Sequence, residues 1–138
     1  MLQNKKTIMD LVVDANIFLA IALNEPEKNQ IIQLTAGSRL VAPEILLYEI
    51  GNALSAMMKR QRLTYQQATK AFSIIELIPV VLEKADIIQA LKISHRYNSY
   101  AYDAYYLEVA QRLRIPLMTL DQKMKNVGNS LNINLLEL

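Results

Sequence analysis

The sequence predicts an α/β protein in which helices cover both faces of a parallel sheet. Short apolar runs rich in β-branched residues alternate with longer segments of helical periodicity, which is the pattern of successive strand–helix–strand units. The 138 residues are 52% hydrophobic and include only three glycines and four prolines, so the chain can bury one core of ordinary size. We therefore expect a single domain over residues 1–138.

The first half of the chain alternates strand and helix candidates. The strand candidates are short and apolar, whereas the helix candidates repeat apolar residues every three or four positions and two of them open at a proline. In chain order they are a strand over 8–13, a helix over 17–23, a helix from Pro26 to about Gly37, a strand over 39–42 and a long helix from Pro43 to Arg60. The basic pair Lys59-Arg60 suits the negative end of the last helix.

The second half continues the alternation. Thr64 is a suitable N-cap, and Pro116 separates a helix from a strand. In chain order the candidates are a helix from Thr64 through Ile75, a strand over 78–81, a helix over 84–97 with Ile87, Ile88, Leu91 and His95 on one side, a helix from Ser99 through Leu113, and strands over 117–120 and 133–136. Ligands of such parallel sheets bind at the carboxyl ends of the strands.

Composition excludes several classes of site. The chain has no cysteine, which excludes disulfides, thiolate–zinc sites and cysteine nucleophiles. Its glycines are too scattered for a Walker A loop or a dinucleotide fingerprint. Apolar runs fall well short of the roughly 18 residues that a membrane span requires, and residues 1–7 make a poor signal peptide, so we expect a cytoplasmic protein. A net charge of +2 neither requires nor excludes a nucleic-acid partner.

Four acidic residues stand at the ends of apolar segments or beside an apolar helix face, namely Asp14, Glu49, Asp103 and Asp121. Each has a structural alternative: the first and last suit helix N-caps, Asp103 suits the positive end of a helix, and Glu49 suits a solvated position. If the four converge, their repulsion requires a cation, and their charge matches two divalent ions. Oxygen ligands favour Mg²⁺ or Mn²⁺, so the pattern predicts one or two such ions and phosphodiester hydrolysis.

Four segments resemble those of the PIN-domain ribonucleases, and among these the VapC-type toxins of toxin–antitoxin pairs. They occur in the family's order and spacing across nearly the whole chain: Val12-Val13-Asp14-Ala15-Asn16, Pro43-Glu44 to Glu49 with Asn52-Ala53-Leu54, Tyr102-Asp103-Ala104-Tyr105-Tyr106-Leu107, and Leu117-Met118-Thr119-Leu120-Asp121. The resemblance implies a sheet of about five parallel strands. It also implies catalytic, metal-binding roles for the four acids, with Asn16 and Thr119 orienting an acid or a metal-bound water.

The same resemblance implies an RNA endonuclease that pairs with a small antitoxin and forms a homodimer. Lys123 and Lys125 follow Asp121 closely enough to touch an RNA phosphate. A typical family start near Met9 would make residues 1–8 an N-terminal extension.

Two other readings remain. One is a non-catalytic PIN-like module that binds RNA or protein without cleaving. The other is a haloacid-dehalogenase-like phosphatase or a receiver domain, which fits poorly because Asn16 and Val13 stand where these proteins need acids.

Overall fold

A parallel sheet forms the centre of the protein, for which a computed structural model describes residues 9–138. Within these residues the sheet has four strands in the order β3-β2-β1-β4. They are β1 (Asp10–Val13), β2 (Arg39–Pro43), β3 (Val81–Glu83) and β4 (Leu117–Met118). Leu11, Val12 and Val13 of the inner strand β1 are all buried, as expected of a strand that is covered on both faces.

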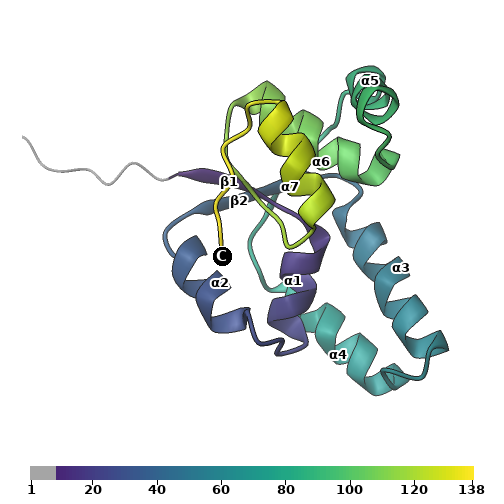
Figure 1. Ribbon diagram of the computed structural model, residues 1–138. Coiled ribbons are helices and arrows are strands. Elements are labelled where there is room, and N and C mark those ends of the chain that lie inside the picture. The colour runs from purple at the N-terminus through teal and green to yellow at the C-terminus, as the bar shows by residue number, and fades with distance from the viewer. Residues whose placement is uncertain (1–8) are drawn as a thin grey trace, which may run out of the picture.

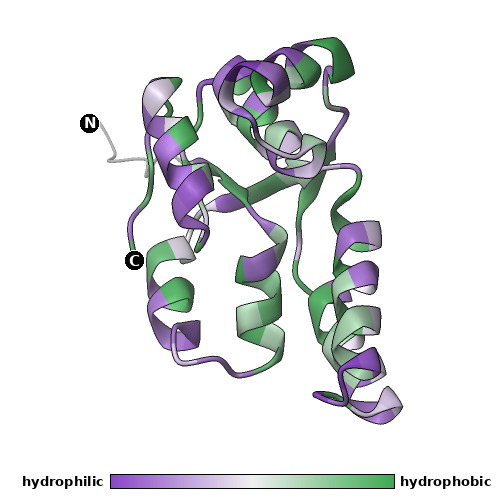
Figure 2. Ribbon diagram, turned by 45° about the vertical axis from the view of Figure 1, so that its right-hand side comes forward, coloured by the Kyte–Doolittle hydropathy of each residue, from purple (hydrophilic) through white to green (hydrophobic). Residues whose placement is uncertain are grey.

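Helices cover the sheet in two groups (Figure 1). They are α1 (Ala15–Ala22), α2 (Lys28–Thr35), α3 (Leu46–Lys59), α4 (Tyr65–Glu76), α5 (Ile87–Tyr97), α6 (Ala101–Leu113) and α7 (Gln122–Ser130). Helix α1 contacts α2, α3 and α4, whereas α6 contacts α5, α7 and three of the strands. The strands between the two groups are largely hydrophobic, as Figure 2 shows, and the core gathers around them.

Several helices begin at a side-chain cap. Asp14, Thr64, Asp86 and Asp121 cap α1, α4, α5 and α7, and Thr64 forms a reciprocal capping box with Gln67. The six predicted helices agree with α1 to α6 to within a few residues, because caps and apolar periodicity are local signals, whereas α7 was not predicted.

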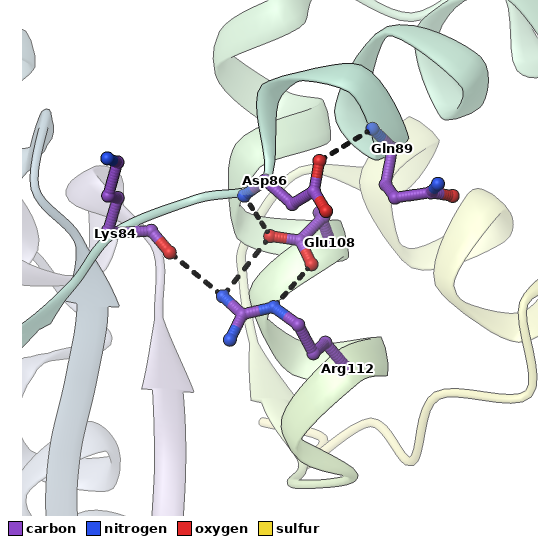
Figure 3. A network of polar contacts seen from close by, with 5 residues as sticks. All are labelled: Lys84, Asp86, Gln89, Glu108 and Arg112. Carbon is purple, nitrogen blue, oxygen red and sulfur yellow. Dashed lines mark hydrogen bonds and ion pairs between the residues drawn. The ribbon is translucent and has the colours of Figure 1, made fainter.

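A polar network joins α6 to the segment that precedes α5 (Figure 3). Glu108, only 3% exposed, accepts hydrogen bonds from the Asp86 backbone N–H at 2.7 Å and from Arg112 Nε at 2.8 Å. Arg112 Nη2 also donates to the Lys84 carbonyl at 2.9 Å, and Asp86 Oδ1 accepts from the Gln89 N–H at the start of α5. The network fixes the connection between β3 and α5 on the side of α6.

The strand predictions were wrong at two places, and the strand predicted over 117–120 is shorter than expected, because β4 covers only Leu117–Met118. The third strand runs from Val81 to Glu83 rather than over 78–81, because Pro79 has no N–H to donate to a neighbouring strand. The predicted strand over 133–136 is only a single bridge between Leu117 and Leu135, flanked by two backbone hydrogen bonds of 2.9 Å. The sheet of residues 9–138 consequently has four strands instead of about five.

Helix α5 turns three large apolar residues outward. Its buried positions are Ala90 and Ile93, whereas Ile87, Ile88 and Leu91 are 55%, 72% and 50% exposed. Ile87 lines a pocket together with Tyr48 of α3, which is 78% exposed. We call these four exposed residues, Tyr48, Ile87, Ile88 and Leu91, the α3–α5 surface.

Two further predictions concern the ends of the chain and the membrane. The suggested extension over residues 1–8 lies outside the described residues. Within residues 9–138, no helix has both the length and the apolar character needed to cross a membrane.

Candidate active site

Each of the four predicted acids stands at the start of a different helix. Asp14 follows β1 and caps α1, and Asp121 follows β4 and caps α7. Glu49 and Asp103 lie in the first turns of α3 and α6. Because β1 and β4 are adjacent and parallel, and α6 packs on β1 and β2, these helix starts meet at the carboxyl edge of the sheet.

Thr119 links two of the acids. Its hydroxyl donates to Asp14 Oδ2 at 2.6 Å and accepts a hydrogen bond from the Asp121 backbone N–H at 3.0 Å. Asp14 Oδ1 accepts from the backbone N–H of Asn16 at 3.1 Å. Both Asp14 and Thr119 are buried, so this carboxylate has one orientation. Thr119 thus contacts the acid that it was predicted to orient, whereas Asn16 contacts it through the backbone and has an exposed side chain.

Capping and ligand binding do not compete for the same oxygen. The cap of α1 uses Asp14 Oδ1, and the cap of α7 uses Asp121 Oδ1, which accepts from the Met124 N–H at 2.9 Å. The structural role that the sequence left open for these two acids is therefore real. The second oxygen of Asp14, Oδ2, also accepts a hydrogen bond from the Thr119 hydroxyl, whereas the cap of α7 uses only Oδ1 of Asp121.

Tyr106 holds the third acid. Its hydroxyl donates to Glu49 Oε1 at 2.6 Å, and its side chain is fully buried. Sequence reasoning missed this contact because the hydrogen bond joins residues 57 apart on different helices. The one local signal is that Tyr106 lies three positions after Asp103, on the same side of α6.

Burial and mutual repulsion act together on the acids. Burial is the largest cause that raises the pKa of Asp14, of Glu49 and of Asp103, the last to about 6. Hydrogen bonds oppose this increase at two sites, because Thr119 lowers the pKa of Asp14 and Tyr106 lowers that of Glu49. The charges of Asp121 and Asp14 raise the pKa of Asp103 further. The acids are thus electrostatically coupled, and a cation would relieve their repulsion.

The two predicted lysines differ in their surroundings. Lys123 lowers the pKa of Asp103 through its charge, and its Nζ donates to the Asn98 carbonyl at 2.5 Å. Lys125 instead forms an ion pair with Glu137 at 3.4 Å. The structure therefore brings Lys123 toward the acidic edge, and it turns Lys125 to the C-terminal segment.

The donor set suits a hard divalent cation that keeps much of its water. In the part of the chain that the structure describes, no three acidic or histidine side chains lie close enough to enclose one ion. Mg²⁺ characteristically takes one or two carboxylates and completes its octahedron with waters and substrate phosphate. Carboxylate oxygens at an open edge of the sheet suit that coordination. They do not suit a structural zinc site, in which four protein ligands enclose the ion.

Comparison with known proteins finds one protein family whose model matches this chain. The family model described as PIN domain matches residues 11–130. Ribonuclease VapC9 of Mycobacterium tuberculosis (strain H37Rv) is 29% identical over 120 residues, which cover 87% of this chain and 92% of that protein. VapC ribonuclease Mb0985 of Mycobacterium bovis matches to the same extent.

Solved structures share the fold. PAE2754 from Pyrobaculum aerophilum superposes with a TM-score of 0.68 at 22% identity, over 88% of this chain and 87% of that chain. VapBC2 from Rickettsia felis, bound to a promoter DNA fragment, gives a TM-score of 0.65 at 16% identity over 94% and 98%. VapC20 of Mycobacterium tuberculosis, described as a sarcin–ricin loop cleaving toxin, gives 0.62 at 15% identity over 86% and 95%.

Proposed function

The chain belongs to the PIN domain family, and we propose that it is a metal-dependent endoribonuclease that serves as the toxin of a toxin–antitoxin pair. The observation that carries the proposal is the meeting of Asp14, Glu49, Asp103 and Asp121 at one edge of the sheet, where their charges are coupled. Partly or fully buried acids that repel one another raise the free energy of the fold unless other groups or a cation compensate their charge, and two relatives of this chain are named as ribonucleases.

Each residue has a role in the proposed reaction. The four carboxylates would hold one or two Mg²⁺ or Mn²⁺ ions, with Thr119 orienting Asp14. When bound, these ions polarise the phosphoryl group and lower the pKa of the attacking water. Lys123 would bind the phosphate backbone beside Asp103. Lys125 retains at most a peripheral role, because Glu137 pairs with it.

The test is cleavage of a mixed RNA pool by purified protein with Mg²⁺, Mn²⁺ or EDTA. Asp14→Asn and Asp103→Asn each remove one charge and keep the size of the side chain, and we expect both to lower the rate by roughly 100-fold or more. Glu44→Gln is the matched control, because this exposed acid directly follows β2 and is not among the charges that raise the pKa of Asp14, Glu49 or Asp103. Cleavage by the folded Asn variants at the wild-type rate would contradict the proposal.

A non-catalytic binding module is the second candidate function. Wild-type protein that retains RNA or a protein partner and cuts nothing with either metal would favour it. The coupled acids argue for catalysis, because a binding module gains nothing from their repulsion.

The proposed partners are a small antitoxin, RNA and a second copy of the chain. The structural likeness to VapBC2 supports an antitoxin, whose gene would lie beside this one. Its product should abolish RNA cleavage when it is added to the purified protein. The α3–α5 surface supports a homodimer, since its four apolar side chains are exposed and two of them, Tyr48 and Ile87, line one pocket, and exposed apolar patches often mark an interface. A cytoplasmic location, where RNA substrates are found, accompanies the proposal.

A further inference from the structure

We propose that Tyr106 is a positioning residue of this site, whose hydroxyl fixes the Glu49 carboxylate at the acidic edge and leaves Oε2 for a cation. The inference rests on the proposed metal-dependent function. It adds a residue outside the four acids and assigns it a role through one of them.

The geometry of the contact is that of a strong hydrogen bond. The donor and acceptor oxygens are 2.6 Å apart, within the range of a hydroxyl bound to a carboxylate. Tyr106 is 0% exposed, so its ring has no freedom to follow a moving partner. Glu49 is only half-buried and lies in the first turn of α3, where its three side-chain torsions would otherwise let the carboxylate turn to water.

Helix α6 therefore determines the positions of two of the four acids. It carries Asp103 directly, and through Tyr106, one turn further on, it holds Glu49 of α3. Because α6 also packs on β1 and β2, the relative placement of these two carboxylates is tied to the centre of the sheet. The positions of these two candidate metal ligands are therefore set by the fold before any cation binds.

A purely structural interpretation of Tyr106 is that a buried phenol only needs some acceptor. This interpretation predicts a loss of stability without a specific change in metal binding. Tyr105 provides the comparison, because it is the adjacent tyrosine, lies against Tyr102 edge-to-face at 6.1 Å, and lines the pocket next to Tyr48 rather than holding an acid.

The experiment measures Mn²⁺ binding by calorimetry at pH 7 for wild type, Tyr106→Phe and Tyr105→Phe. The phenylalanine at 106 keeps the buried ring and removes only the hydroxyl. Because loss of a group that orients a metal ligand commonly weakens affinity by 10- to 100-fold, we expect a loss of about 10-fold or more for Tyr106→Phe. Tyr105→Phe should bind Mn²⁺ as wild type does. Urea unfolding confirms that each variant is folded.

A double-variant cycle shows whether Tyr106 acts through Glu49. In the Glu49→Gln background, Tyr106→Phe should cause little further loss of Mn²⁺ affinity. An equal loss in both backgrounds, or wild-type affinity in Tyr106→Phe, would overturn the inference, as would wild-type protein that binds no Mn²⁺.

RNA cleavage is a separate readout. Tyr106→Phe should lower kcat at limiting Mn²⁺, recover with excess Mn²⁺ and leave the KM for RNA unchanged. If wild type binds Mn²⁺ but cuts no RNA, the proposed function fails while the binding cycle still decides the role of Tyr106.

Discussion

At the scale of single residues, Asp103 makes stability depend on pH. Its pKa is raised to about 6 in the folded protein, chiefly by burial and then by the charges of Asp121 and Asp14. In the unfolded chain it returns to an ordinary value near 4. Between these values the folded state binds a proton that the unfolded state releases, so the free energy of unfolding decreases as pH rises from about 4 to about 6.

This pH dependence can be measured by urea unfolding between pH 4 and 8 in EDTA, which removes adventitious divalent cations. The raised pKa values of Asp14 and Glu49 act in the same direction. Asp103→Asn should flatten the decrease between pH 4 and 6 relative to wild type. An unchanged slope in that variant would show that Asp103 does not take up the proton, and Glu44→Gln serves as the control.

The four acids could be identified from the sequence, but only some of the residues that hydrogen-bond to them could. Asp14 and Asp121 follow apolar strands directly, so their common edge follows from the parallel sheet. Thr119 was predicted through resemblance to a family. Tyr106 was not predicted in this role, because its partner is 57 residues away and no local pattern encodes that distance.

At the scale of elements, Arg112 stabilises the connection between β3 and α5. Its Nε donates to Glu108 at 2.8 Å and its Nη2 to the Lys84 carbonyl at 2.9 Å. Arg112→Ala would leave the buried Glu108 carboxylate with fewer donors. Since Arg112 is itself partly exposed, we expect the free energy of unfolding to fall by about 1–2 kcal/mol.

Denaturation in urea provides the measurement for Arg112→Ala. Lys92→Ala, which shortens an exposed basic side chain on α5, is the matched control and should change stability by less than about 0.5 kcal/mol. Equal stability of the two variants would mean that the network of Figure 3 contributes nothing beyond a surface charge.

Apart from α7, which was not predicted, helices were easier to predict than strands, and the reason is physical. A helix is specified by its own caps and period, as the capping box of α4 illustrates. A strand also requires hydrogen bonds to a neighbouring strand, which its own residues do not specify. β3 therefore begins where Val81 pairs with Val41, and residues 133–136 form only an isolated bridge. The helical period also placed Ile87, Ile88 and Leu91 on one side of a helix, but it did not show that this side is exposed to solvent.

At the scale of the whole molecule, the outward side of α5 predicts self-association. If the α3–α5 surface is the interface of the proposed homodimer, the Ile88→Lys variant should be a monomer. Dimerisation would bury the lysine charge away from water, which costs free energy. The fold should survive, since Ile88 is 72% exposed. Light scattering coupled to size-exclusion chromatography gives the mass.

Leu77→Lys is the matched control for the oligomeric state. Leu77 is 83% exposed at the end of α4, so it is as accessible as Ile88 but stands outside the α3–α5 surface. A dimer that persists in Ile88→Lys and dissociates in Leu77→Lys would move the interface to α4, and a monomeric wild type would remove the homodimer from the proposal.

The hydrogen bond between Thr119 and Asp14 joins residues 105 apart, and this has a consequence during synthesis. Contacts of such separation form only after most of the chain is available, so no early folding intermediate or N-terminal fragment can assemble the acidic edge. The acidic edge of a nascent chain is therefore incomplete until residues beyond Asp121 have left the ribosome. For a protein proposed to cut RNA, this order of assembly would delay cleavage until synthesis of the chain is nearly complete.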